Sequence, residues 1–363
     1  MVPHVDVLLV ALGSVNTDAR TRNLARALSN AGYSVAVIAA GAVDGVHMFR
    51  WDDPGGSAFV RWRSLQAYVR TVRVHATTVF GMDLFALQAA QRIAKKCKAQ
   101  LFYDMREFYF ALGPLEGRGW KQKLIAWHER LLLKHVDQVI VSGYLDVGII
   151  QKKFRLPKPP HILLNTPPWR ERVVSTYLRD TYNIPTSAVV VLYQGVVHHG
   201  RGIAPFIKAM CELPNVHLCV VGDGPAKHQL RNLSTSLQLD KRVHWHDAVD
   251  YDRLHSITCS ADIGLCLIEP VSESYRYALP NKMFEYMMAG VPVLATDLPA
   301  LREQLVRMPC GVLVSETLSV QTIREGFERL QVPATYQAMQ AICARVRTVS
   351  YEHQARNLIE KLL

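Results

Sequence analysis

Short apolar runs alternate with helix-like segments along the whole chain, and this alternation limits the fold more than any other feature. Strands that alternate with helices form parallel sheets covered on both faces, so the pattern predicts an α/β fold. Strand candidates in the first half are residues 5–12, 33–40, 99–105 and 137–143, and those in the second half are 189–195, 217–223, 243–248, 261–268, 291–296 and 310–315. Helices are expected to begin near Thr17, Phe85 and Gly119, and then near Gly202, Ala226, Asp252, Asn281 and Leu298.

A proline-rich stretch at residues 155–171 separates the two groups of strands and indicates the approach to a linker. With 363 residues, the chain is long enough for two domains with separate cores. We therefore predict one Rossmann-like domain over residues 1–168 and a second over residues 169–349. In such folds ligands bind at the carboxyl ends of the strands, so a cleft between the two domains is the expected site.

Composition indicates a large soluble protein, because 49% of the residues are apolar and 20% are charged. No apolar run approaches the roughly 18 to 20 residues that cross a bilayer. The opening run VDVLLVALGS is short and lacks a basic leader, so it is interpreted as a strand and not as a signal peptide. Seven scattered cysteines without a CxxC pair favour a reducing compartment, and we expect a cytoplasmic protein.

Charge is distributed unevenly between the halves of the chain. Residues 1–180 contain 25 Lys and Arg against 14 Asp and Glu, a net charge of +11, whereas residues 181–363 contain 17 of each. Two basic segments of the first half, residues 59–74 and 119–137, carry apolar side chains at helical spacing, with tryptophans at 62, 120 and 127. Such helices are typical of proteins that rest on anionic lipid headgroups at the inner face of a membrane.

Two other interpretations of these basic segments are considered. In the first, Trp62 and Trp127 belong to the core and the cations only solvate an outer face. In the second, the basic surface binds nucleic acid, which the isoelectric point of about 9.3 would permit. No RNA- or DNA-binding motif occurs in the sequence, so nucleic acid is disfavoured.

The segment Leu279–Thr296 carries the most specific local pattern. Pro280 and Asn281 are typical of a helix start, Lys282 adds a cation, and Glu285 follows one turn later. The amide groups and dipole of a helix start stabilise phosphate oxygens, and a carboxylate nearby can accept two hydrogen bonds from a ribose diol. The pattern therefore favours a nucleotide diphosphate site, although an ordinary capped helix followed by a strand has the same shape.

This segment resembles the donor-site signature of the retaining GT-B glycosyltransferases, in particular the large family 4 group. Other segments resemble the same family in the same order along most of the chain, namely residues 18–38, 193–203, 220–230 and 349–363. The resemblance implies two Rossmann-like parallel-sheet domains that face a cleft, a final helix (residues 350–363) that packs back on the N-terminal domain, and a nucleotide-diphosphate sugar as donor.

The resemblance also implies donor-binding roles in the second half. Arg201 stands where the family usually has a lysine that stabilises the leaving diphosphate, and Glu285 is the second glutamate of a pair separated by seven residues. Asn281 and Lys282 belong to the helix start beside it. Gly222 lies in a turn near the donor, and His246 lies where the family places the base. Two positions depart from the family, because Val196 replaces an arginine and Tyr277 replaces the first glutamate.

In the first half the resemblance places further contacts at strand ends. Gly13 follows the opening strand and is expected to approach the donor. Asp18, Arg20 and Asp83 are expected to line the acceptor side of the cleft, where Phe80 and Met82 replace residues that many relatives use. Asp104, Arg106 and Glu107 are proposed as catalytic or acceptor contacts, and the alternative is a buried salt bridge at the end of a strand.

No essential metal or cofactor is expected. Asp250 and Asp252 form a DxD pattern just before a helix, where capping is the better interpretation, while His244 and His246 alternate along a strand. A dinucleotide oxidoreductase is disfavoured, because no GxGxxG follows the first strand.

The sequence thus predicts a hexosyltransferase that acts with retention on a polysaccharide, lipid-linked or other glycan acceptor. A noncatalytic nucleotide-sugar-binding partner subunit and a GT-B-fold epimerase are the alternatives.

Overall fold

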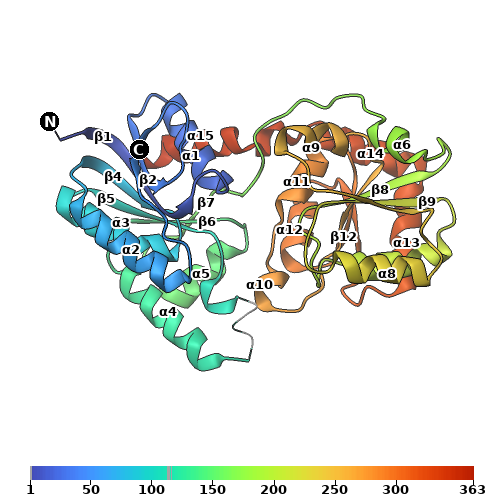
Figure 1. The fold of residues 1–363 in the computed structure, drawn as a ribbon, viewed down its shortest axis with the longest axis horizontal. Coiled ribbons are helices and arrows are strands. Elements are labelled where there is room, and N and C mark those ends of the chain that lie inside the picture. Colours follow the sequence, from blue (N-terminus) through green and yellow to red (C-terminus); the bar gives the residue numbers. More distant parts are fainter. Residues whose placement is uncertain (1, 113–114, 116) are drawn as a thin grey trace. The chain divides into compact units, whose positions relative to one another are not determined.

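The computed structural model describes residues 2–112, 115 and 117–363. The chain forms two compact units, Met1–Pro168 with Tyr351–Leu363 (unit 1) and Trp169–Ser350 (unit 2). Each unit contains one parallel β-sheet with helices on its faces (Figure 1). The prediction of two parallel-sheet α/β domains is therefore confirmed.

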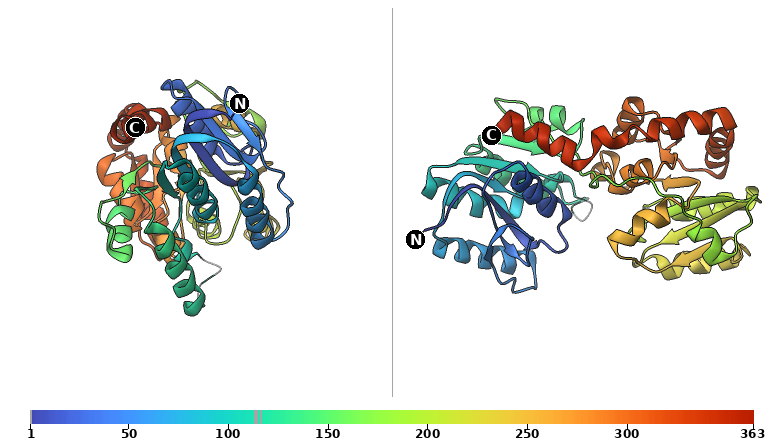
Figure 2. Two further views of the ribbon diagram at one scale, coloured as in Figure 1. Left: turned by 90° about the vertical axis from the view of Figure 1, so that its left-hand side faces the viewer. Right: turned by 90° about the horizontal axis from the view of Figure 1, so that it is seen from above.

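The sheet of unit 1 has seven strands in the order β3-β2-β1-β4-β5-β6-β7. Its strands are β1 (His4–Ser14), β2 (Val35–Ala40), β3 (His47–Arg50), β4 (His75–Gly81), β5 (Gln100–Met105), β6 (Gln138–Val141) and β7 (His161–Ile162). Its helices are α1 (Ala19–Asn30), α2 (Ala58–Thr71), α3 (Leu84–Cys97), η1 (Tyr109–Ala111), α4 (Gly119–Leu133), α5 (Asp146–Phe154) and α15 (Tyr351–Leu362). Helices α1 and α15 pack together on one face of the sheet, and α2, α3 and α4 cover the other (Figures 1 and 2).

The sheet of unit 2 has six strands in the order β10-β9-β8-β11-β12-β13. Its strands are β8 (Val189–Gln194), β9 (Val216–Val221), β10 (Val243–His246), β11 (Ile263–Cys266), β12 (Val293–Thr296) and β13 (Gly311–Val314). Its helices are α6 (Tyr177–Tyr182), α7 (Ile203–Ala209), η3 (Met210–Glu212), α8 (Lys227–Ser236), α9 (Tyr251–Thr258), α10 (Glu273–Arg276), α11 (Asn281–Met288), α12 (Pro299–Arg307), α13 (Val320–Gln331), α14 (Pro333–Cys343) and η4 (Val346–Val349).

Both sheets have the strand order of a Rossmann fold, in which the first strand lies in the interior and the chain leaves it in both directions. The order reverses between β1 and β4 in unit 1, and between β8 and β11 in unit 2. Ligands of such sheets bind beside the carboxyl ends of the strands at this reversal. The loops after β1, β4, β8 and β11 are therefore the segments that position a site.

Three strands of unit 1 were not among the strand candidates. β3 and β7 are short edge strands, which leave little periodic signal. β4 lies in the interior of the sheet between β1 and β5, but it begins with His75 and Thr77 exposed and contains two threonines, so it does not form a continuous apolar run. Its prediction required the pairing with β1, for example Leu8 with Val79.

The two basic amphipathic segments differ in the structure. In α2, Leu65 and Val69 are buried, and Trp62 is half-buried against Phe59, with 5.8 Å between ring centroids. In α4, Trp120 and Trp127 are 67% and 59% exposed. The interpretation that places Trp127 in the core is therefore wrong. Among the described residues, no helix is both long enough and apolar enough to cross a membrane.

The inner face of α4 carries a buried acid. Glu129 accepts a hydrogen bond from the Tyr103 hydroxyl through Oε1 (2.7 Å), and its Oε2 has no hydrogen-bond partner among the described residues. Burial raises the pKa of Glu129 to about 7, against the opposing effects of Tyr103 and Lys153. The folded protein therefore holds a proton at Glu129 between about pH 4.5 and pH 7, where the unfolded chain releases it.

We expect Glu129→Gln to make the protein more stable than the wild type at pH 8 but not at pH 4.5. Because the pKa of Glu129 is higher in the folded than in the unfolded state, the wild type keeps its full stability below the unfolded-state pKa. Its free energy of unfolding then falls as the pH rises through the folded-state pKa, by up to about 3 kcal/mol. Urea unfolding of both proteins at several pH values measures the difference between their free energies of unfolding. The contributions of other titrating groups cancel in this difference. A difference that stays constant with pH would show that Glu129 does not titrate in this range.

Candidate active site

Glu285 lies on α11, one turn after the helix begins at Asn281, as predicted from the sequence. Gln194, the last residue of β8, donates from Nε2 to Glu285 Oε2 at 2.5 Å. Thr258 in turn donates its hydroxyl to Gln194 Oε1 at 2.8 Å, which fixes the orientation of the amide. Burial raises the pKa of Glu285, and the hydrogen bond from Gln194 and the charges of Lys282 and Arg170 oppose this shift. Among the described residues, Oε1 receives no hydrogen bond and keeps its acceptor capacity.

One cation lies at the start of the same helix, and the charge of a second, from another loop, acts on it. Lys282 is only 9% exposed, and its Nζ lies 3.6 Å from the centroid of the Tyr193 ring. Burial lowers the pKa of Lys282 to about 7, and the like charge of Arg201 adds to this effect. The guanidinium of Arg201, in the loop between β8 and α7, lies 4.9 Å from the centroid of the Tyr275 ring. Aromatic faces thus hold both cations, which is a favourable surrounding for a bound anion.

The loop after β8 is shaped by glycines. A Cβ on Gly202 would lie 2.3 Å from the Leu267 Cβ, and a Cβ on Gly222 would lie 2.1 Å from the Gly195 carbonyl oxygen. Both glycines have positive φ. Gly222, predicted as a donor contact, therefore allows the loop after β9 to pack directly against the loop after β8.

Glu269 and Gln194 were not found by sequence reasoning. Glu269 follows β11, and its Oε1 accepts from the Gly202 amide at 3.3 Å, while its own amide donates to the Gly200 carbonyl at 3.0 Å. The signal in each case was a polar residue at the end of an apolar strand. Their partners are 67 and 91 residues away in the sequence, so periodicity could not reveal them.

The start of α11 differs in one respect from the prediction. Pro280 occupies the N-cap position, and no side chain caps the helix there. Asn281 is exposed as the first helical residue. Capping by these side chains is therefore not observed, although the helix begins where the sequence predicted.

The histidines of β10 have packing partners. His246 Nε2 lies 3.0 Å from the Tyr177 hydroxyl, and His244 stacks between His217 and Tyr182. Asp250 occupies the N-cap position of α9 without a side-chain capping bond, and Asp252 pairs with Arg170 at 2.6 Å. Among the residues that the structure describes, no group of three or more His, Cys, Asp or Glu side chains could hold a metal ion.

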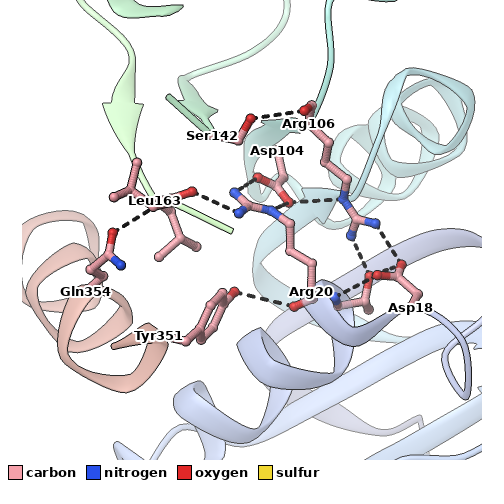
Figure 3. Close-up of polar contacts among 10 residues, drawn as sticks. Asp18, Arg20, Asp104, Arg106, Ser142, Leu163, Tyr351 and Gln354 are labelled. Carbon is pink, nitrogen blue, oxygen red and sulfur yellow. Dashed lines mark hydrogen bonds and ion pairs between the residues drawn. The ribbon is translucent and has the colours of Figure 1, made fainter. Parts of the chain in front are cut away.

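A network of alternating charges joins α1 to the end of β5 in unit 1 (Figure 3). Arg20 donates from Nε and Nη2 to the two oxygens of Asp104, at 2.7 and 2.6 Å. Arg106 donates to Asp104, Asp18 and Thr21, at 3.3, 2.8 and 2.6 Å. Asp18 also caps α1 by accepting from the Thr21 amide. Four charged side chains thereby fix one another.

The members of this network differ in their exposure to solvent. Asp104 is 0% and Arg20 is 4% exposed, and two arginines keep the pKa of Asp104 low despite its burial. This geometry corrects the assignment of Asp104 as a catalytic contact and of Arg20 as a cleft residue, because a fully enclosed ion pair does not reach a substrate. It agrees with the alternative of a buried salt bridge. Arg106 remains 19% exposed at its side chain, and Glu107 is exposed.

Two further predicted residues of unit 1 lie at strand ends beside the reversal: Asp83 follows β4, whereas Gly13 lies within the last two residues of β1 and not in a loop after it, as the sequence had predicted. Asp83 accepts from the Ala86 amide at 2.6 Å and caps α3 after β4. Burial raises the pKa of Asp83 to about 6, although Arg106 opposes the shift. Gly13 has φ of +128°, and a Cβ there would lie 3.0 Å from Nη2 of Arg61, which pairs with Asp53.

A cavity of about 500 Å³ lies beside the carboxyl ends of β1, β2 and β3. It is lined by Asn16, Ala40, Gly41, Ala42, Arg50, Trp51, Asp52 and Asp53.

Comparison with known proteins decides the family. The model of "Glycosyl transferases group 1" matches residues 175–333, and that of "Glycosyl transferase 4-like domain" matches residues 17–144, so most of both units is covered. The chain belongs to the group 1 glycosyltransferases.

Two curated glycosyltransferases are similar to the chain over part of their length. The chain is 36% identical over 76 residues to the lipopolysaccharide core biosynthesis glycosyltransferase LpsD of Rhizobium meliloti, covering 21% of this chain and 22% of that protein. It is 24% identical over 130 residues to the O-antigen biosynthesis glycosyltransferase WclY of Escherichia coli, covering 36% and 35%. The aligned regions thus span about a fifth to a third of these relatives.

Solved structures confirm the fold. Sucrose-phosphate synthase from Thermosynechococcus elongatus has a TM-score of 0.75 at 16% identity, covering 99% of this chain and 98% of that one. HepE of Anabaena in complex with UDP-glucose has a TM-score of 0.71 at 12% identity, covering 99% and 100%. The two parallel-sheet units of this glycosyltransferase have the GT-B fold.

Proposed function

We propose that this glycosyltransferase moves a hexosyl group from a nucleotide-diphosphate sugar to a polysaccharide, lipid-linked or other glycan acceptor, with retention of configuration. The observation that supports it most is the arrangement around α11, where Lys282 lies at the helix start, the charge of Arg201 reaches Lys282, and Gln194 orients the carboxylate of Glu285 one turn further on. Cations and helix amides suit a diphosphate, and the carboxylate suits a ribose. The complex of the structurally similar HepE with UDP-glucose supports a UDP-sugar as the first donor to test.

Each predicted residue has a part in this proposal. Arg201, Lys282 and the amides at Asn281 hold the leaving diphosphate, while Glu285 Oε1 accepts from the ribose. His246 lies on the side of the base, and Gly222 keeps the loops of the donor site together. In unit 1, Gly13 approaches the donor, and Asp18, Asp83, Arg106 and Glu107 face the acceptor. Asp104 and Arg20 act as positioning residues, because their buried ion pair holds Arg106 in place.

The proposed reaction is a displacement on one face of the sugar. The bond from the sugar C1 to the phosphate oxygen breaks, and a bond from the acceptor oxygen to C1 forms on the same side. The acceptor proton passes to the departing phosphate oxygen. Positive charge at Arg201 and Lys282 stabilises the negative charge that develops on the diphosphate.

Nucleotide release from a panel of UDP-, GDP- and dTDP-sugars, with and without a glycolipid extract as acceptor, tests this function. We expect release with one nucleotide that depends on the acceptor. Binding without release would favour the noncatalytic partner subunit. The main argument for that alternative is that the chain departs from the family pattern at two positions, the exposed Val196 and Tyr277. Release or isomerised sugar without acceptor would favour an epimerase.

The charge of the N-terminal half also belongs to this proposal. Because residues 1–180 carry the whole excess of positive charge, we propose that the protein works at the inner, anionic face of a membrane, where a lipid-linked acceptor is available.

A further inference from the structure

Helix α4 exposes a continuous apolar stripe. Trp120, Leu124, Trp127 and Leu131 are 67%, 54%, 59% and 36% exposed. At about 100° per residue these four positions fall within an arc of roughly 60° on one side of the helix. Side chains of this size seldom lie together on an unpartnered surface, and a contiguous exposed patch marks an interaction site.

The opposite side of α4 fixes the direction in which this stripe points. Glu129, Leu132 and Leu133 are buried, and Glu129 accepts the hydrogen bond from Tyr103 in β5. The helix packs against α3 and η1. Since Glu129 lies about 180° around the helix from Trp120, the stripe faces away from the sheet of unit 1.

Cations border the stripe on both sides. Lys123, Arg130 and Lys134 lie about 40° to 80° to one side of Trp120, and Lys121 lies about 100° to the other. Lys121 Nζ is 5.3 Å from the centroid of the Trp120 ring, and Arg130 donates to the Lys153 carbonyl at 2.8 Å. Glu129 is the one acidic residue of α4 and faces inward. The exposed part of the helix is therefore apolar and cationic.

The combination of apolar and cationic side chains on α4 indicates which partner binds this surface. A second copy of the chain that packed stripe to stripe would bring the two sets of cations together, which is unfavourable. A bilayer with anionic lipids accepts tryptophan and leucine at the headgroup boundary and attracts the flanking lysines and arginines. Helix α2 lacks this arrangement, because its Leu65 and Val69 are buried in the unit.

We propose that the outer face of α4 is the surface by which the protein binds an anionic lipid bilayer. The inference deepens the proposed function, since it names the surface that brings unit 1 to a lipid-linked acceptor. It requires no nucleotide and no turnover, so vesicle binding tests it separately from glycosyl transfer.

Sedimentation with phosphatidylcholine vesicles, with and without one third phosphatidylglycerol, is the test. We expect wild-type protein to sediment with the anionic vesicles at low salt and less at high salt. Replacing Trp120 and Trp127 with serine should lower the partition coefficient at least about tenfold. Replacing Lys121 and Lys123 with glutamine should lower it at low salt and reduce the salt dependence.

Matched controls are Val306→Ser, an exposed apolar residue of unit 2 at 73% exposure, and Lys208→Gln, an exposed cation of α7. Both should bind vesicles as the wild type does. Because the tryptophans are exposed, thermal unfolding and nucleotide binding of the serine variant should match the wild type. Equal sedimentation with neutral and anionic vesicles, unchanged binding of the tryptophan variant, or a concentration-dependent dimer lost in that variant would overturn the proposal.

Discussion

Glu285→Gln is expected to lower the affinity for the nucleotide and kcat/KM by about 100-fold, the largest loss from a single neutral replacement in unit 2. A carboxylate that accepts hydrogen bonds from a ribose diol contributes about 1.5 to 3 kcal/mol per charge-assisted bond. Glutamine has a similar size and keeps one acceptor oxygen, but it removes the charge. Titration calorimetry with UDP, or with whichever nucleotide the panel selects, measures the loss.

The same substitution should leave the free energy of unfolding unchanged or slightly higher. Burial raises the pKa of Glu285, so the ionised carboxylate costs the unliganded protein free energy that a neutral amide does not. Glu303→Gln on α12, where the side chain pairs with Arg307 at the surface, is the matched control and should retain nucleotide binding. Nucleotide affinity of Glu285→Gln within twofold of the wild type would contradict the donor-site assignment.

Secondary structure was the part of the fold that could best be predicted from the sequence. The helix starts expected near Gly202, Ala226, Asp252, Asn281 and Leu298 agree with the observed helices within one residue. These starts follow from local chemistry, in which a turn or a proline ends an apolar strand and an amphipathic segment follows. The interior strand β4 was missed because its threonines and its exposed first residues conceal its burial, which only the neighbouring strands create.

The site could be predicted from the sequence only in part, because some of its contacts join residues that are far apart along the chain. Glu285 and Lys282 lie in one local pattern, and the resemblance to a family identified them. The hydrogen bond from Gln194 to Glu285 joins residues 91 positions apart, and the ion pair of Arg20 with Asp104 joins residues 84 positions apart. Sequence patterns within one helix or strand carry no information about such pairs. They also did not decide whether Asp104 was enclosed, since burial of a strand end depends on the elements packed around it.

Nucleoside diphosphate binding at pH 8 is expected to be accompanied by proton uptake, and Lys282 is the group that receives the proton. Burial lowers the pKa of Lys282 to about 7, so most of the unliganded protein has a neutral amine at pH 8. A diphosphate beside it favours the ammonium and raises this pKa, whereas the terminal phosphate, with a pKa near 6, is already ionised. Affinity should therefore fall as pH rises above about 7.

Calorimetry at pH 8 in buffers of different ionisation enthalpy counts the protons directly. Lys282→Met should bind the nucleotide about 30- to 100-fold more weakly at pH 6.5, because the charge-assisted bond is lost, and should take up no proton at pH 8. Lys282→Arg keeps a permanent charge and should bind with little pH dependence. Lys208→Met, which removes an exposed cation of α7, should behave as the wild type. If proton uptake persists in Lys282→Met, another group titrates on binding, and the cationic role of Lys282 in the donor site is excluded.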